Sequence, residues 1–199
     1  MDGDIMSNDL NLLKEYDYLT FKDAKNHGIS KYKFYQYVKD NNLEKIDRGV
    51  YIQKNNLVDE LVLIYQKCPQ VVFSHDEAFY FYNLSDREPL VHTFTIYSGY
   101  NTHRLKEKGN YKIYNVKKEL LDVGKVYVKD NFGNEIPMYN LERTICDLFR
   151  NRNSIEIQDF TTVLRSYVIR NDKNLNLLME YAKLFNISKI VRKYMEVLL

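Results

Sequence analysis

The stretch from Leu19 to Tyr51 constrains the fold of this 199-residue chain more than any other. It contains two short helical patterns around a Gly-Ile-Ser turn, followed by a basic hairpin pattern. Thr20 and Asp23 form a capping-box pattern, with Asp in place of Glu, which predicts the start of a helix. His27-Gly28 predicts its end after one to two turns, because glycine readily adopts a positive φ. The first half of the stretch is therefore expected to be a short helix followed by a tight turn.

Ser30 predicts the N-cap of a second helix, over roughly residues 31 to 41. Its apolar positions repeat with helical spacing and predict a buried face made of Phe34, Tyr37, Val38 and Asn41. The opposite, exposed arc consists of Tyr32, Lys33, Gln36 and Lys39. These residue types suit DNA, since lysine binds phosphate or guanine acceptors and glutamine binds an adenine edge or phosphate. Tyrosine can stack on a base, contact a methyl group or bind phosphate.

A hairpin is predicted next, between strands at roughly residues 43 to 46 and 50 to 52, with Gly49 in its turn. Helix, turn, helix and basic hairpin in this order predict a winged helix-turn-helix that binds DNA. A helix over residues 8 to 17, capped by Ser7, would support it. The predicted DNA contacts are Lys22, Ser30, Lys31, Tyr32, Lys33, Gln36, Lys39, Lys45 and Arg48. The alternative is a solvated helical face that docks another protein.

Charge is segregated along the chain, although the formal net charge is only +2. Residues 1 to 17 contain five acidic residues and one lysine, whereas residues 18 to 54 contain eight basic and four acidic residues. The positive charge therefore coincides with the predicted DNA-binding elements. A later stretch offers either additional phosphate contacts or a solvated loop through Arg104, Lys106, Lys108 and Lys112.

Cysteine positions and hydropathy argue against disulfides, a zinc site and a membrane span. Cys68 and Cys146 are far apart and lack a Cys/His cluster, so neither a disulfide framework nor a zinc site is expected. No apolar run approaches the roughly 18 to 20 residues that a membrane span needs, and the first residues are acidic rather than basic. We therefore expect a cytoplasmic protein with no metal, no cofactor and no membrane association.

The residue patterns that could indicate catalysis are better explained by structural roles. A metal-dependent nuclease needs carboxylates that share Mg²⁺. His75, Asp76 and Glu77 are consecutive at a predicted helix start, where neighbouring side chains diverge by about 100°. Arg143 and Asp147, four residues apart, predict a polar network within the domain. Because no phosphate loop, Ser-His-Asp elbow or HExxH motif occurs, we expect no catalytic residues and no enzyme. A DNA-binding nuclease or nuclease-like defence protein is the alternative.

The region from residue 57 onwards predicts a second, larger domain. A helix over residues 57 to 67 is followed by a short buried strand at 71 to 73 and by a helix over 75 to 82, capped by Ser74. Further strands are predicted at residues 91 to 97, 111 to 116, 125 to 128 and 135 to 139. Helical patterns follow, with predicted N-caps at Asn140 and Ser154. Residues 172 to 174 are predicted to open a further helix that runs to Phe185, and Ile187-Ser188 to open the last.

The predicted fold class is α+β, with two domains. Residues 1 to 56 are expected to form the winged helix-turn-helix. Residues 57 to 199 are expected to form a mixed domain with a small, mostly antiparallel sheet, which is helical from about residue 140.

Three segments carry a family resemblance. Gly28-Ile29-Ser30 precedes a helix, and Arg48-Gly49-Val50-Tyr51 closes the hairpin. Ser74 to Pro89 begins Ser-His-Asp-Glu-Ala, and Tyr139 to Arg150 contains Tyr-Asn-Leu-Glu-Arg-Thr-Ile-Cys-Asp-Leu. Together they resemble the AbiEi family of antitoxins from bacterial type IV, or abortive-infection, toxin-antitoxin systems. Asn83 departs from the family's usual glycine, but asparagine also tolerates the left-handed conformation.

The resemblance implies an antitoxin that is also the transcriptional autorepressor of its own operon. It implies double-stranded operator DNA with inverted repeats as the ligand, and opposition to a nucleotidyltransferase toxin without a stable complex. Two copies are expected per operator. The chain has no heptad pattern or evident dimerisation helix, which favours monomers that cooperate on DNA over a dimer. A protein-docking adaptor that uses a winged helix is a further alternative.

Overall fold

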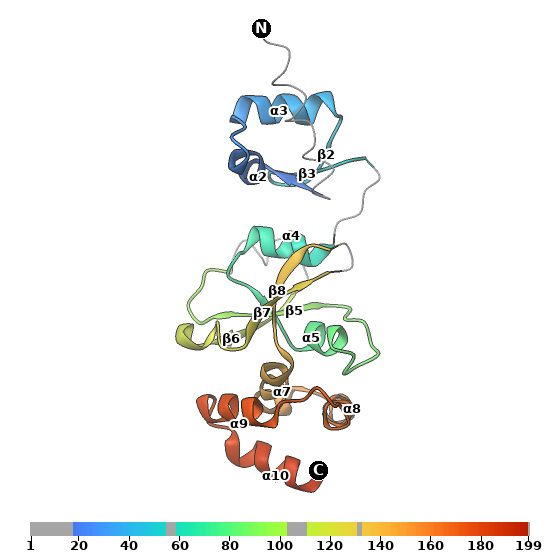
Figure 1. The fold of residues 1–199 in the computed structure, drawn as a ribbon, viewed down its shortest axis with the longest axis vertical. Helices are drawn as coiled ribbons and strands as arrows, with labels where there is room; N and C mark the ends of the chain where they lie inside the picture. Colours follow the sequence, from blue (N-terminus) through green and yellow to red (C-terminus); the bar gives the residue numbers. More distant parts are fainter. Residues whose placement is uncertain (1–17, 55–58, 103–110, 131–132, 199) are drawn as a thin grey trace. The chain divides into compact units, whose positions relative to one another are not determined.

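The computed structural model describes residues 18–54, 59–102, 111–130 and 133–198. These residues divide into two compact units (Figure 1). The first contains the described residues up to Leu63 together with Gly133, and the second contains Ile64 to Asp130 and the chain from Asn134 onwards. The division falls within helix α4 (Glu60–Lys67), a few residues beyond the predicted boundary. The predicted support helix at residues 8 to 17 and its cap Ser7 lie outside the described residues.

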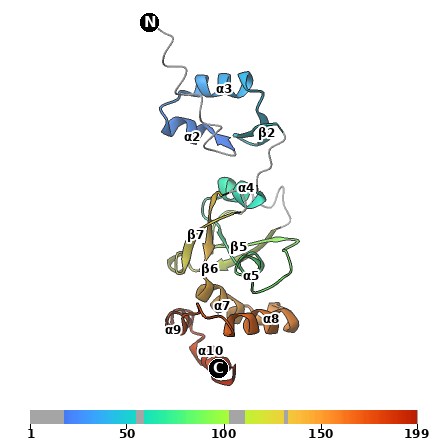
Figure 2. The same cartoon turned by 45° about the vertical axis from the view of Figure 1, so that its right-hand side comes forward.

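The N-terminal unit follows the predicted order of local elements (Figure 2). Strand β1 (Leu19–Thr20) leads into α2 (Phe21–Asn26) and α3 (Lys31–Asp40), followed by β2 (Glu44–Asp47) and β3 (Val50–Ile52). The three strands form an antiparallel sheet in the order β1-β3-β2. The extra strand, β1, has no distinct sequence signal because it is only two residues long.

The helix caps predicted at Thr20 and Ser30 are confirmed. The Thr20 hydroxyl accepts a hydrogen bond from the Asp23 N–H at 3.3 Å, and the Asp23 carboxylate accepts one from the Thr20 N–H at 3.0 Å. Ser30 Oγ accepts from the Lys33 N–H at 3.4 Å. At the turn between the two helices, Gly28 has a φ of 76°, which a residue with a side chain rarely adopts. Local hydrogen bonds therefore set where α2 and α3 begin and end.

Phe34 is the centre of the small core of this unit. Its side chain is 1% exposed and packs with Leu19, Ala24 and Leu43. Its ring lies 5.9 Å from the ring of Phe21 and 5.7 Å from that of Tyr51, measured between centroids. One face of α3 is therefore held against α2 and the sheet.

The C-terminal unit contains a five-stranded mixed sheet. Its strands are β4 (Val72–Phe73), β5 (His92–Tyr97), β6 (Tyr111–Val116), β7 (Lys125–Lys129) and β8 (Glu135–Tyr139), in the order β6-β5-β4-β8-β7. The β4–β5 and β7–β8 pairs are antiparallel, whereas β5–β6 and β4–β8 are parallel. The prediction of a mostly antiparallel sheet is therefore wrong. Its strand positions are nearly right, but the direction of pairing depends on long connections, which carry no local turn signal.

The described part of this unit also contains helices that follow α4. They are α5 (Asp76–Phe81), α7 (Leu141–Arg150), α8 (Ile157–Val168), α9 (Leu175–Leu184) and α10 (Ser188–Leu198), with 3₁₀ turns η2 (Lys118–Leu120) and η3 (Arg152–Ser154). In both views α7 to α10 gather on one side of the sheet (Figures 1 and 2). They share a core centred on Ile145, Leu148, Phe149 and Leu178. The chain is thus a mixed α and β protein with two sheets and a helical C-terminal end, as predicted.

Of the three predicted caps in this unit, Asn140 is confirmed, whereas Ser74 and Ser154 are wrong. Asn140 caps α7 by accepting from the Arg143 N–H at 2.9 Å, and Asn174 caps α9. Ser74 does not cap α5, because its hydroxyl is bonded to Thr95 Oγ1 on the neighbouring strand at 2.8 Å. Ser154 lies in η3 instead, and Glu156 occupies the N-cap position of α8. No helix in the described ranges is long and apolar enough to cross a membrane.

Candidate nucleic-acid interface

Helix α3 presents opposite chemistry on its two sides. Phe34 is buried in the core, whereas Tyr32 on the other side is 72% exposed. Lys33, Gln36 and Lys39 are also exposed. Burial of Phe34 therefore turns the predicted polar arc of α3 outwards, to solvent.

The hairpin beside α3 adds two exposed cations, Lys45 on β2 and Arg48 in the turn. Gly49 follows with a φ of 80°, so the two strands can reverse over a very short turn. The Asp47 carboxylate accepts the Arg48 backbone N–H at 2.6 Å. This hydrogen bond organises the turn from which the Arg48 side chain projects.

Two tyrosines connect α3 with the hairpin. The ring of Tyr35 on α3 lies 6.2 Å from the ring of Tyr51 on β3, and Tyr51 pairs across the sheet with Lys45. Burial, followed by the neighbouring Tyr35, raises the pKa of the Tyr51 phenol above its ordinary value. The phenol is therefore neutral at physiological pH and adds no negative charge beside Lys45.

Nine predicted contact residues lie in the N-terminal unit, and all nine are exposed. Five of them lie on α3 and Ser30 caps it, Lys45 and Arg48 lie on the hairpin that α3 contacts through Tyr35 and Tyr51, and Lys22 lies on α2. Tyr35, which is 43% exposed, was missed by the sequence reasoning. Its signal was present, because positions 32, 35, 36 and 39 follow the i, i+3, i+4, i+7 spacing of one helical face.

Of the four additional phosphate contacts predicted from the sequence, the structure describes Lys112. Arg104, Lys106 and Lys108 lie outside the described residues. Lys112 is on β6, with its ammonium 5.4 Å from the centroid of the Tyr114 ring. A hydrogen bond with Tyr114 raises the pKa of the Lys112 ammonium above its ordinary value, and the nearby Asp76 also raises it. Lys112 is thus already engaged with side chains of its own unit.

Arg143 is the centre of a buried polar cluster in the C-terminal unit. Its Nε donates to Asp147 Oδ2 at 3.1 Å, which confirms the predicted pair. Its Nη1 donates to the carbonyl oxygens of Leu120 at 3.0 Å and Val123 at 2.6 Å. The Arg150 guanidinium completes the cluster by donating to Asp147 Oδ1 at 2.6 Å. These partners tie α7 to the η2 region and give Arg143 a structural role.

His75 is fully enclosed next to this cluster. Its ring stacks on Tyr114 at 3.3 Å between centroids, and Nδ1 and Nε2 lie 3.0 Å from Ser74 Oγ and 2.9 Å from Asn151 Nδ2. Burial lowers the pKa of the imidazole to about 3, with contributions from nearby cations such as Arg150. The ring is therefore neutral and both nitrogens have partners, so His75 is not available as a metal ligand or base.

The two carboxylates after His75 have separate partners. Glu77 Oε1 lies 2.6 Å from His92 Nδ1, whereas Asp76 lines a pocket of about 320 Å³ together with Arg87 and Lys112. Burial raises the pKa of the Asp76 carboxyl above its ordinary value. Among the residues that the structure describes, no three His, Cys, Asp or Glu side chains form a group that could hold a metal ion.

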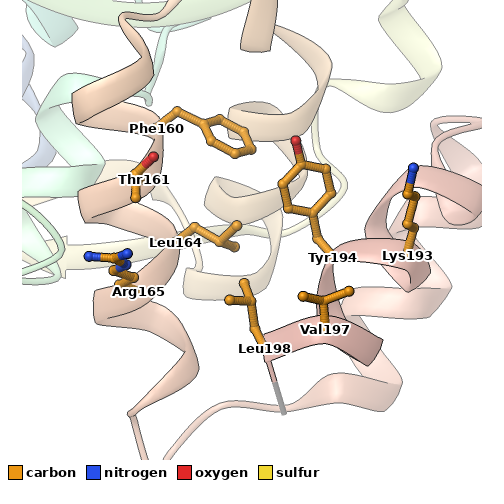
Figure 3. A pocket seen from close by; sticks show the side chains of 8 residues that line it. All are labelled: Phe160, Thr161, Leu164, Arg165, Lys193, Tyr194, Val197 and Leu198. Atoms are coloured by element: carbon orange, nitrogen blue, oxygen red, sulfur yellow. The ribbon is translucent and has the colours of Figure 1, made fainter.

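A second hollow, of about 300 Å³, lies between α8 and α10 (Figure 3). It is lined by Phe160, Thr161, Leu164, Arg165, Lys193, Tyr194, Val197 and Leu198. Phe160 and Tyr194 point toward one another, with ring centroids 5.6 Å apart, and Val197 is 78% exposed. The side chains labelled in Figure 3 include no carboxylate or histidine, and the polar groups among them belong to Thr161, Arg165, Lys193 and Tyr194.

Comparisons with known proteins give a likeness in fold. No protein-family model matches the chain, and no curated protein matches it. Its fold is similar to that in the crystal structure of the RV2827C protein from Mycobacterium tuberculosis, with a TM-score of 0.57 and 10% sequence identity. The similarity covers 89% of this chain and 70% of the other. At this identity the likeness concerns the fold alone.

Proposed function

We propose that this chain is a DNA-binding antitoxin and the autorepressor of its own type IV toxin-antitoxin operon. The N-terminal unit is, in this proposal, a winged helix-turn-helix in which α3 is the recognition helix and the β2–β3 hairpin is the wing. The chain binds inverted-repeat operator DNA and opposes a nucleotidyltransferase toxin without forming a stable complex with it. The antitoxin part rests on the sequence resemblance to the AbiEi family.

The observation that carries the DNA-binding proposal is the exposed face of α3. Tyr32, Lys33, Gln36 and Lys39 point away from the core in which Phe34 is buried, and Lys45 and Arg48 project from the adjoining hairpin. An α-helix fits the major groove of B-DNA, where such side chains reach base edges and phosphates. Lysine and arginine in a hairpin can neutralise further phosphates along the backbone.

Removing part of this surface is expected to weaken operator binding strongly. In a Lys33→Ala, Gln36→Ala, Arg48→Ala triple variant, we expect the affinity for promoter DNA of the chain's own operon to fall about a hundredfold. The reason is the loss of two cationic contacts and one hydrogen-bonding side chain. Gel-shift titration or fluorescence anisotropy at one fixed salt concentration measures the change.

The matched control removes two positive charges from the other unit, with Lys183→Ala and Lys189→Ala. Both lysines are exposed, and they lie on α9 and α10. This variant should bind the promoter with nearly unchanged affinity. Equal weakening in both variants would indicate a general charge effect, and unchanged binding by the triple variant would exclude α3 and the hairpin as the DNA-binding surface.

Antitoxicity is expected to be separable from complex formation. Co-expression of this chain with a nucleotidyltransferase encoded beside it should restore growth that the nucleotidyltransferase alone arrests. An affinity-tagged copy of the chain should nevertheless not retain that protein after washing. A stable complex on co-purification, combined with no promoter affinity, would favour the adaptor alternative, and Mg²⁺-dependent DNA cleavage lost in Asp76→Ala would favour the nuclease.

A further inference from the structure

Tyr32 and Gln36 form a hydrogen-bonded pair on the exposed face of α3. The Gln36 amide nitrogen Nε2 donates to the Tyr32 hydroxyl oxygen at 2.9 Å. The residues are four apart, so they lie one helical turn from each other on the same face. This hydrogen bond restricts the orientation of the Gln36 amide. A lone glutamine on a helix surface has no such restriction.

The helix beneath this pair is held in place by contacts of its own. The Ser30 cap sets its first turn, and the ring of Phe34, between the two residues in sequence, anchors its inner side. At the other end Asn42, with a φ of 50°, turns the chain so that the Leu43 N–H donates to the Val38 carbonyl at 2.9 Å. The Tyr32–Gln36 pair therefore stands on a helix whose ends and inner face are all fixed.

The remaining hydrogen-bonding groups of Gln36 match one base. With one Nε2 hydrogen directed to Tyr32, the amide retains a second N–H donor and the Oε1 acceptor. Adenine presents a matching set in the major groove, the N7 acceptor and the N6 amino donor. Guanine presents two acceptors there, so it can use the N–H but leaves Oε1 opposite another acceptor.

We infer that the Tyr32–Gln36 pair is the base-reading element of α3 and selects an adenine in each half-site. This inference rests on the proposed DNA-binding function and adds the base chemistry of the operator. The neighbouring cations Lys33 and Lys39 serve phosphate, which a neutral amide binds more weakly. The exposed Tyr32 ring supplies an apolar surface for a nearby thymine methyl group.

The test is selection of binding sites from a random double-stranded DNA library with the 199-residue chain. The wild type should enrich a motif with one A·T pair per half-site that is preferred about tenfold over G·C. Gln36→Ala should lose the preference at that position alone. Gln36→Glu should shift it to C·G, because a carboxylate accepts a hydrogen bond from the cytosine N4 amino group. Tyr32→Phe should keep the motif but reduce the preference severalfold.

Lys39→Ala is the control for a contact that carries no sequence information. It should weaken binding to all sequences and reduce the salt dependence by about one unit of the log-log slope, with base preferences unchanged. Circular dichroism of each variant confirms that α3 is intact. If the wild type enriches a motif and Gln36→Ala enriches the same motif with equal preference, the inference is overturned while the DNA-binding proposal stands. If the wild type enriches no motif and binds no promoter DNA, both are overturned.

Discussion

Replacing Arg143 with alanine is expected to destabilise the C-terminal unit by about 3 to 5 kcal/mol, the usual result of removing one partner of a buried ion pair. The side chain is fully buried, and its guanidinium lies 3.9 Å from the Tyr139 ring centroid and 4.3 Å from that of Phe185. Without it the carbonyl groups of Leu120 and Val123 lose their donor. The buried Asp147 carboxylate keeps only Arg150 as a cationic partner.

This loss is large compared with the net stability of a domain, which is about 5 to 15 kcal/mol. Urea unfolding followed by far-ultraviolet circular dichroism measures it, and hydrogen exchange of the α7 amides assigns it to the C-terminal unit. The control is Arg165→Ala, which removes an exposed arginine from α8 and should change the free energy of unfolding by less than about 0.5 kcal/mol.

A backbone variant tests the same cluster without removing any charge. Gly124 has a φ of 75°, and a Cβ placed there would lie 2.5 Å from the Arg143 Cβ. Gly124→Ala should therefore also be destabilising, through both its backbone conformation and the displacement of Arg143. Near-native stability of Arg143→Ala, or of both variants, would show that the cluster does not hold α7 and the η2 region together.

Acid is expected to destabilise the C-terminal unit through His75. The folded pKa of about 3 lies below the ordinary value of 6.5, so the unfolded chain binds a proton that the folded one does not. The contribution of this residue to stability is complete above pH 6.5. It is lost at about 1.4 kcal/mol per pH unit as the pH falls towards 3, which amounts to about 3 kcal/mol by pH 4.

His75→Asn isolates this effect from the titration of carboxyl groups. Asparagine does not titrate in this range, and it is among the residues that best tolerate a positive φ, which is 54° at this position. The free energies of unfolding of wild type and variant should be compared at pH 7, 6, 5 and 4. The difference in favour of the wild type should shrink steadily below pH 6.5, whereas a pH-independent difference would contradict a buried neutral imidazole.

The candidate interface could be predicted largely from the sequence because its signals are local. The capping box of Thr20 and Asp23, the Ser30 cap and the Gly28 turn involve hydrogen bonds and φ values within three or four residues. Helical periodicity alone then separates Phe34 from the exposed arc. Tyr35 shares this periodicity with the exposed arc, but its contact with Tyr51 of β3 is a tertiary one that the helical spacing does not predict.

In the C-terminal unit, two residues show that a local sequence pattern does not always predict the structure. Ser74 has the sequence context of a helix cap, yet it bonds to Thr95 on the adjacent strand. The sequence predicts that Lys112 is a phosphate contact or lies in a solvated loop, yet it lies on β6 beside Tyr114 and Asp76. In both cases strand pairing or packing brings in a partner that is distant in sequence, Thr95 for Ser74 and Asp76 for Lys112.

By itself the sequence determined most of the described helices and strands, the N-caps at Thr20, Ser30 and Asn140, and the chemistry of the exposed face of α3. These depend on interactions among residues that are close in the chain. Only the tertiary structure decided the parallel pairing of β5 with β6, the burial of Arg143 among backbone carbonyls and the enclosed state of His75. Those features depend on contacts between distant segments, whose free energy exists only when the whole unit is packed.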